Sequence, residues 1–324
     1  MRDTTPASLR ELARGQAGLV TRAQALRAGL TSNAITSKVV HARWAQVHRG
    51  VYATFTGPLT RDAQLWAAVL SAGRGARLSH ETAAEIIRLA DRESSLVHVA
   101  IPASRRVRPA RGVAIHISSR GGAGWRFARG VPSHTFAEET LLDLANAAST
   151  LDDVIGYITA AFARDLTSEE RLRREAAARK RLRWRADLDE IITKAAGGAH
   201  SILEYRYDRD VEQAHGLPPA RKQATFTKSD GHRGRRDRSY EQYGGLIIEL
   251  DGRQYHPNER RHLDQARDNA ATATGGSTLR YGWDDVTRRP CTVAAQVHAA
   301  LVKRKYRGTL KPCSPSCGAF RRTG

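Results

Sequence analysis

The segment LIIELDG, residues 246–252, constrains the fold of this chain more than any other stretch. Its four apolar residues stand between glycines, a pattern that predicts a strand buried in a sheet. Two carboxylates, Glu249 and Asp251, share one face of this strand because side chains alternate along it. An ionised carboxylate in an apolar setting is unfavourable unless its pKa shifts or it gains a cation. If the carboxylates stay ionised, the question is whether their cationic partner is an arginine or a metal ion.

The sequence around this strand predicts a compact α/β domain with a mixed sheet over residues 199–310. The expected order is a helix at SILEYRYDRDVEQAHG, strands at RKQATFT, RDRSY and GLIIELDG, a helix at NERRHLDQARDNAATATGG, a strand at STLRYGW and a last helix over residues 291–305. The preceding AGGAH interrupts a highly charged helical stretch, so we place the domain boundary there.

Residues 1–56 have a different pattern, three short helices followed by a hairpin. Thr21 and Thr31 stand where N-caps are expected, and Gly29 follows the last turn of the second helix. RWAQVHRGVYAT alternates apolar and polar residues around an HRG turn, which indicates a hairpin. This order predicts a winged helix-turn-helix. Its eight basic and two acidic side chains give a net charge of +6, which favours a polyanionic partner.

We expect the helix that begins near Thr31 to enter a groove of double-stranded DNA. Polar side chains at its start would meet base edges, and basic side chains would lie near phosphates. The groove-facing candidates are Ser32, Asn33, Thr36 and Ser37. The phosphate-facing candidates are Lys38, Arg43 and Arg49. A winged helix used for protein contact is the alternative.

Residues 57–198 predict a mixed α/β middle region. Amphipathic helices flank two alternating strands, SLVHVAIP and GVAIHIS, and a charged helical linker follows them. Residues 311–324 predict a flexible tail. The predicted fold class is therefore α/β, as an α+β multidomain chain, and a length of 324 residues agrees with two or three domains.

The composition favours nucleic acid as the partner, because the net charge is +20 and the isoelectric point is near 10.7. No apolar run is long enough for a membrane helix, and the N-terminus lacks the apolar core of a signal peptide. We therefore expect a cytoplasmic protein without a membrane partner.

The acids of the last domain form the main candidate for chemistry. Glu204 lies on its first helix, and Asp237 lies on the strand before that of Glu249 and Asp251. Neighbouring strands joined by a turn can bring such side chains together, and Mg²⁺ or Mn²⁺ would relieve the repulsion between them. The alternative is pairing on a solvated face with arginines. The arginines that we considered are Arg235, Arg236, Arg238 and Arg253.

Several motifs of this domain resemble one nuclease family. LPPARKQ, RDRSYEQYGGLIIELDGRQYHPNERR, QARDNA and LRYGWDDVTRRP resemble bacterial domains of the PD-(D/E)XK superfamily, which are similar to the very-short-patch mismatch-repair endonuclease. The resemblance implies a restriction-endonuclease-like fold that cleaves DNA with Mg²⁺ or Mn²⁺. Glu204, Asp237 and Glu249 match its acidic positions, and Asp251 stands where many members place a lysine. His256 is then a candidate for activating water, and the alternative is a surface histidine that follows a turn.

In such a nuclease, arginines near the site would hold the scissile backbone, because the planar guanidinium grips phosphate in two places. Arg236 and Arg253 are the main candidates for this role.

The N-terminal stretch GLVTRAQALRAGLTSNAITSKVVHARWAQVHRGVYA resembles the winged-helix domain of AbiEi antitoxins from type IV toxin–antitoxin systems. LSHETAAEIIRL, VHVAIP and FAEETLLDLA are similar to the middle region that accompanies it in many actinobacterial proteins. This resemblance implies DNA binding, often with transcriptional autoregulation, and a cognate toxin as a candidate partner.

Two functions follow from these patterns. The first is a DNA-binding protein with a fused metal-dependent endonuclease domain. The alternative is a non-enzymatic regulator or antitoxin whose nuclease-like fold is idle, because fold alone does not secure function.

The three cysteines do not favour a further site. Cys313 and Cys317 in CSPSC could be half of a zinc site, but no second Cys/His pair follows them. We therefore expect free thiols on a loose tail.

Overall fold

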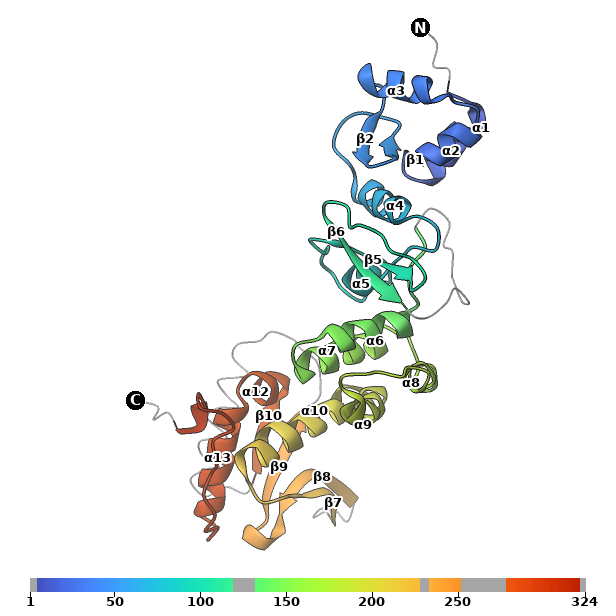
Figure 1. Cartoon of the computed structure of the whole chain (residues 1–324). Helices are drawn as coiled ribbons and strands as arrows, with labels where there is room; N and C mark the ends of the chain where they lie inside the picture. Colours follow the sequence, from blue (N-terminus) through green and yellow to red (C-terminus); the bar gives the residue numbers. More distant parts are fainter. Residues whose placement is uncertain (1–4, 119–131, 228–232, 252–277, 321–324) are drawn as a thin grey trace. The chain divides into compact units, whose positions relative to one another are not determined.

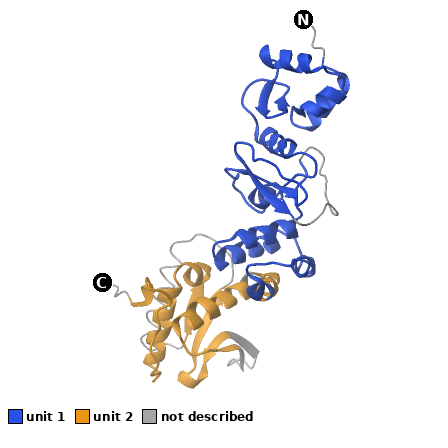
Figure 2. Ribbon diagram, viewed as in Figure 1, with its two compact units in different colours: residues 1–189 blue, residues 190–324 orange. Residues whose placement is uncertain are grey.

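A computed structural model describes residues 5–118, 132–227, 233–251 and 278–320, and for residues 223–227 and 233–236 it describes only the backbone. The chain divides into two compact units, Met1–Asp189 and Glu190–Gly324 (Figure 2). Each unit has its own buried core. The expected multidomain α+β fold class is confirmed.

The first unit begins with the expected three helices and hairpin. The helices are α1 (Ala7–Gly15), α2 (Arg22–Arg27) and α3 (Ser32–Val40). The strands are β1 (Leu19–Thr21), β2 (Ala45–His48) and β3 (Val51–Ala53), in the order β1-β3-β2 (Figure 1). Thr21 caps α2 and Thr31 caps α3, each by accepting a backbone N–H. Ile35 and Trp44 pack in the core below α3.

The rest of this unit is a three-stranded sheet with helices. Its strands are β4 (Arg77–Leu78), β5 (Val97–Pro102) and β6 (Val113–Ser118), with β5 and β6 parallel. Its helices are α4 (Arg61–Ala72), α5 (His80–Ile86), α6 (Ala137–Ala147), α7 (Leu151–Ala163) and α8 (Glu169–Ala177). The charged stretch that we expected as one helical linker is divided into α8 and α9 (Arg185–Ala196), and the boundary between the units lies within α9.

The second unit is built on a four-stranded mixed sheet. Its strands are β7 (Arg221–Thr227), β8 (Arg233–Tyr240), β9 (Leu246–Asp251) and β10 (Thr278–Gly282), in the order β10-β9-β8-β7. The helices α10 (Gly198–Arg206), α12 (Trp283–Arg288) and α13 (Pro290–Val302) accompany it (Figure 1). The segment η1 (Tyr207–Gln213) is a π-helix that continues α10. Two short 3₁₀ helices are η2 (Glu241–Tyr243) and η3 (Gly318–Phe320).

The apolar run of β9 is a central strand, as its pattern predicts. It pairs antiparallel with β8 and parallel with β10. The β8–β9 connection is wider than a tight hairpin, because Gly244 and Gly245 follow η2 and both adopt positive φ, which glycine does without strain. The helix that we expected at NERRHLDQARDNAATATGG lies outside the described residues.

A network of ionisable groups is buried between this sheet and the helix that precedes it. Arg238 on β8 is 1% exposed, and its Nη2 lies 2.8 Å from Oδ1 of Asp208 on η1. Nearby, the Tyr240 hydroxyl donates to Oε1 of Glu212 at 2.8 Å. Burial raises the pKa of Glu212 to about 7, although the hydrogen bond from Tyr240 opposes the shift. Glu212 is therefore mainly protonated in the folded chain below neutral pH.

This raised pKa predicts how stability changes with pH. Between pH 4.5, the ordinary pKa of a glutamate, and about pH 7, folded Glu212 binds more protons than unfolded Glu212. The stability that protonated Glu212 contributes to the fold is therefore lost as pH rises through this window. The full difference corresponds to about 3 kcal/mol. Glu212→Gln keeps an acceptor for Tyr240 but cannot ionise, so we expect it to remove this loss. Urea unfolding at pH 5 and pH 8, with hydrogen exchange of β8 amides as the local readout, measures it.

Glu241→Gln is the matched control, since Glu241 pairs with Arg221 on the exposed surface. Equal pH dependence of the wild type and Glu212→Gln would contradict the role given to Glu212.

Candidate nucleic-acid interface and acidic centre

The exposed face of α3 carries the polar side chains that we expected at a DNA groove. Ser32, Asn33, Thr36 and Ser37 are all exposed, whereas Ile35 turns into the core. The Thr31 hydroxyl accepts from the Ala34 N–H at 3.1 Å and fixes the start of the helix. The first two turns of α3 therefore present small hydrogen-bonding side chains to solvent on a capped helix.

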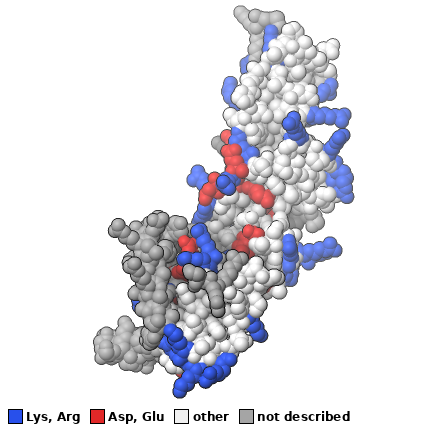
Figure 3. Space-filling model, turned by 90° about the vertical axis from the view of Figure 1, so that its left-hand side faces the viewer, with Lys and Arg blue, Asp and Glu red and all other residues white. Residues whose placement is uncertain are grey.

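Exposed arginines lie in the segments next to this helix in the chain. Arg43 lies three residues after the end of α3, and Arg49 lies in the turn between β2 and β3, the wing. Arg22 on α2 donates to the Ser32 hydroxyl at 2.7 Å, so its guanidinium lies beside the start of α3. Over the face of the molecule in Figure 3, Lys and Arg are widely spread, whereas Asp and Glu gather in fewer places. This distribution suits a partner with a phosphate backbone.

Lys38 does not lie where a phosphate contact requires it, which corrects our expectation for this residue. It is 5% exposed, and its Nζ donates to the Thr5 hydroxyl at 2.8 Å and lies 5.6 Å from the centre of the Trp44 ring. The amphipathic period explains this, because Lys38 stands three residues after the buried Ile35 and points into the same side of the domain. The side chain of Lys38 therefore stabilises the fold.

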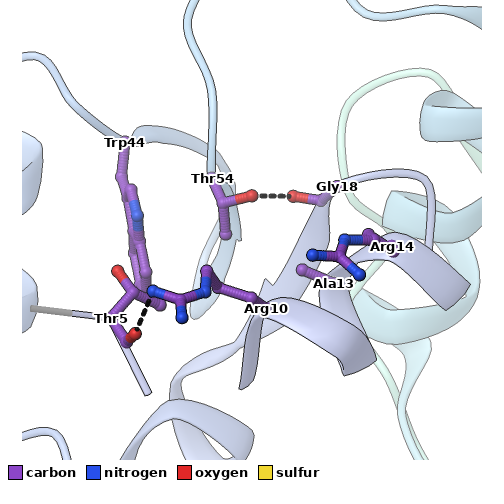
Figure 4. Close-up of a pocket in the computed structure, with 7 residues that line it drawn as sticks. All are labelled: Thr5, Arg10, Ala13, Arg14, Gly18, Trp44 and Thr54. Atoms are coloured by element: carbon purple, nitrogen blue, oxygen red, sulfur yellow. Dashed lines mark hydrogen bonds between the residues drawn. The ribbon is translucent and has the colours of Figure 1, made fainter. Parts of the chain in front are cut away.

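A hollow lies on the same domain between α1 and the strands (Figure 4). Its lining residues are Thr5, Arg10, Ala13, Arg14, Gly18, Trp44 and Thr54. Arg10 Nη1 donates to the Thr5 carbonyl at 2.9 Å, and the Thr54 hydroxyl donates to the Gly18 carbonyl at 3.0 Å. Arg10 is therefore engaged in holding the segment that precedes α1.

In the second unit, the structure brings two of the predicted acids together around a histidine. His200 and Glu204 lie one turn apart on α10, and Asp237 lies on β8. His200 Nε2 is 3.4 Å from Glu204 Oε1 and 3.4 Å from Asp237 Oδ1. One ligand atom of each residue lies within 4.8 Å of the other two. We call this group of three the acidic centre.

Backbone and guanidinium contacts fix the two carboxylates of the acidic centre. Asp237 Oδ2 accepts from the Leu250 N–H of β9 at 2.7 Å, which leaves Oδ1 toward His200. Arg238 Nη1 lies 3.5 Å from Glu204 Oε1. Burial opposes the charge on Arg238, but Asp208 and Glu204 outweigh it and raise the pKa of the guanidinium. Arg238 thus remains charged and offsets the repulsion between the acids.

Glu249 and Asp251 do not join the acidic centre. Arg280 on the parallel neighbour β10 stands opposite Glu249 in register, and its Nε lies 2.7 Å from Glu249 Oε2. Asp251 is exposed at the end of β9. The cation that accompanies Glu249 is therefore an arginine, though not one that we considered from the sequence.

The other site predictions of this domain remain untested. Arg253 and His256 lie outside the described residues, and the side chains of Arg235 and Arg236 are not described.

Helix α10 and the segment η1 that follows it carry a sequence signal that the motifs did not reveal. His200, Glu204, Asp208 and Glu212 recur every fourth position, the spacing of one helix face. Asp208 and Glu212 meet the buried Arg238 and Tyr240, while His200 and Glu204 belong to the acidic centre. This stripe could have predicted that one face of the helix carries all four groups toward the sheet.

A histidine cluster in the first unit was also not predicted. His98 Nδ1 lies 2.9 Å from His116 Nε2, and the rings of His80 and His116 stack with centroids 3.7 Å apart. Burial, assisted by the neighbouring His116, lowers the pKa of His80 to about 4. His98 and His116 alternate with valine and isoleucine on β5 and β6, where strand periodicity places them on one face. Being neutral at pH 7, His80 packs here as an aromatic group.

No helix in the described ranges has the length and apolar character that crossing a membrane requires.

Comparison with known proteins supports the N-terminal part of these expectations. Residues 8–54 match the family described as "Transcriptional regulator, AbiEi antitoxin". No curated protein matches the chain. Among solved structures, the RV2827C protein from Mycobacterium tuberculosis is similar with a TM-score of 0.40 and 18% identity, over 60% of this chain and 78% of that one.

The matched residues run from α1 to the end of the wing, and they include the capped helix α3 with its exposed polar face. Residues 8–54 are therefore similar to the AbiEi antitoxin family of transcriptional regulators.

Proposed function

We propose that this chain is a transcriptional regulator that binds double-stranded DNA through its N-terminal domain, with α3 in the major groove. The observation that carries the proposal is the exposed polar face of α3, which is flanked in the chain by segments that carry exposed arginines. The family match over residues 8–54 supports the same function. A recognition helix of this kind contacts base edges with its first residues.

The two kinds of side chain have different roles in this proposal. Asn33 can donate and accept toward one base, which is how an amide discriminates adenine. Arg43 and Arg49 contact phosphates, which gives affinity without sequence preference. Lys38 takes no part in these contacts because its ammonium is buried.

The resemblance to AbiEi antitoxins suggests which DNA site and which protein partner this chain would bind. The operator would lie at the promoter of the chain's own gene, and a cognate toxin would be its protein partner.

We expect Arg49→Ala and Asn33→Ala to affect DNA binding in different ways. Loss of Arg49 removes about one phosphate contact, so affinity falls for all duplexes and the slope of log K against log salt drops by about one. Loss of Asn33 weakens discrimination between operator and non-operator by about 1–3 kcal/mol. Fluorescence anisotropy of the full chain on both duplexes, at several salt concentrations, measures the two effects.

Two further variants serve as controls. Arg111→Ala removes an exposed arginine from the middle region and should leave the salt slope unchanged. Lys38→Met should lower the thermal stability of the winged helix while the remaining folded protein keeps its salt slope. The proposal fails if no duplex binds at low salt, or if Arg49→Ala behaves as Arg111→Ala does.

A second candidate function is metal-dependent hydrolysis of DNA in the second unit, as the resemblance to PD-(D/E)XK nucleases implies. The observation that favours it is the acidic centre, where Glu204 and Asp237 turn carboxylate oxygens toward one point beside His200. Oxygen ligands suit Mg²⁺, and the added imidazole suits Mn²⁺. These residues therefore fit a divalent ion, whereas Glu249 fits only after its bond with Arg280 opens.

The roles of the residues follow from their contacts. A bound divalent ion would activate water and stabilise charge on the scissile phosphate. Asp237 would hold the ion through Oδ1, because its other oxygen accepts a hydrogen bond from the Leu250 N–H. Glu204 would hold it through Oε1, the oxygen that lies beside His200. The buried guanidinium of Arg238 orients the carboxylate of Glu204 through their ion pair. In this second candidate, Arg280 would release Glu249 and be free to contact a phosphate.

We expect Asp237→Asn to abolish Mg²⁺- or Mn²⁺-dependent nicking of supercoiled plasmid, down to the level seen with chelator. The change keeps the acceptor for the Leu250 N–H but removes the charge that an ion needs. Glu241→Gln, an exposed acid elsewhere in the unit, should cleave as the wild type does. Glu249→Gln tests whether this strand carboxylate joins the reaction.

Calorimetry with Mn²⁺ tests binding apart from cleavage. The nuclease proposal fails if the wild type does not bind Mn²⁺ and does not cleave plasmid, mismatched duplex or single strands. The proposed function is then that of a transcriptional regulator alone.

A further inference from the structure

A second group of potential metal ligands gathers in the same unit, from residues far apart in sequence. Its members are His215, Cys291, Cys313 and Cys317, and one ligand atom of each lies within 4.8 Å of all the others. We call this group the thiol cluster. His215 and Cys317 are buried, Cys291 is half-buried and Cys313 is exposed. All three cysteines are free thiols.

The distances in the thiol cluster match a tetrahedral ion site. The Sγ atom of Cys291 lies 3.6 Å from that of Cys313 and 3.8 Å from that of Cys317. A zinc–sulfur bond of about 2.3 Å in a tetrahedron places two sulfurs about 3.8 Å apart. A disulfide requires about 2.05 Å and would use only two of the three sulfurs.

The histidine is held in the orientation and tautomer that a metal ligand needs. His215 is 0% exposed, and its Nδ1 lies 3.2 Å from the Val211 carbonyl, to which it donates. The lone pair is therefore on Nε2. Nε2 is buried and has no hydrogen bond of ordinary geometry among the described residues, and the Cys317 thiol is a group that interacts with this ring. A ligating histidine commonly donates its other N–H to a backbone carbonyl in this way, which fixes the ring toward the ion.

The fold brings the four residues together from three places. His215 follows η1, Cys291 lies in the first turn of α13, and the other two cysteines belong to the segment after α13. The N–H of Lys311 donates to the His215 carbonyl at 2.8 Å and holds this last segment against the histidine. Cys313 and Cys317 are separated by three residues, within the spacing that zinc sites use for a pair of ligands.

From this arrangement we propose that His215, Cys291, Cys313 and Cys317 bind one structural Zn²⁺ in a closed Cys₃His site. Three thiolates and an imidazole are soft and borderline ligands, which select zinc over Mg²⁺ or Mn²⁺. All four positions of the tetrahedron are filled by the chain, so the site is structural and leaves no position for a substrate.

The site would hold the C-terminal segment to the domain. Residues 303–317 contain neither α-helix nor strand, and Cys317 is the one buried residue among them. The apolar contacts of this segment with the core are made by Tyr306 and Leu310, which are only partly buried. A metal bound to two of its cysteines would add a stronger link to α13 and to His215.

Metal analysis of the purified full chain tests the proposal. We expect one equivalent of zinc per chain after dialysis without chelator. Replacement by Co²⁺ should give sulfur-to-cobalt charge-transfer bands and the intense visible bands of a tetrahedral ion. Cys313→Ser, at an exposed position, should lose the charge-transfer intensity of one thiolate and most of the zinc. Mass spectrometry after limited proteolysis should then show the C-terminal segment cut sooner.

Matched variants distinguish a zinc site from thiols that lie close together without an ion. Ser316→Ala, between the two cysteines, should keep both the zinc and the cobalt spectrum. His215→Cys should retain a tetrahedral ion with stronger charge-transfer bands, whereas His215→Ala should lose it. His200→Ala alters the acidic centre and should leave the thiolate bands unchanged, so failure of the nuclease proposal does not affect this one.

Three results would overturn the proposal. The first is a chain that contains no zinc and gives no tetrahedral cobalt spectrum. The second is iron in place of zinc. The third is three native thiols that react with a thiol reagent equally fast whether zinc is present or absent.

Discussion

The buried guanidinium of Arg238 is the contact on which the second unit depends. It lies between the helical segment α10–η1 and the sheet, bonded to Asp208 and close to Glu204. Removing one member of such a buried pair typically destabilises a protein by about 3–5 kcal/mol, because the other charge is left without a partner. The same contact fixes β8 against α10 and so places Asp237 opposite Glu204 and His200. The geometry of the acidic centre therefore depends on the buried ion pairs of Arg238.

Local patterns explain which parts of the fold could be predicted from the sequence. The N-caps Thr21 and Thr31 act on backbone groups within three residues, and the HRG turn joins two adjacent strands. Because these signals are local, the winged helix could be predicted from them. The apolar run of β9 predicts a central strand because only a strand with neighbours on both sides buries it fully. Glu204 and Asp237 lie where strand and helix periodicity place them.

Contacts between distant segments explain what could not be predicted. Arg280 reaches Glu249 only because β10 pairs in parallel with β9, a register that no local pattern sets. Lys38 has the charge of a surface residue, but helical period and the position of Thr5 bury it. The thiol cluster joins His215 to cysteines about a quarter of the chain later, so a search for neighbouring ligand pairs does not find it.

The two ligand groups of the second unit differ in the hardness of their donor atoms, and this difference separates the ions that they would take. The acidic centre offers two carboxylates and one imidazole from exposed or half-buried positions, while the thiol cluster offers three sulfurs and a buried imidazole. On the proposed assignments, zinc would partition to the sulfurs, and a hard ion would bind only at the carboxylates. A structural ion in the thiol cluster would hold α13 and the C-terminal segment whether or not the acidic centre performs chemistry. If both ions bind as proposed, removing zinc would act on the folding of the domain, and removing magnesium would act on its reaction.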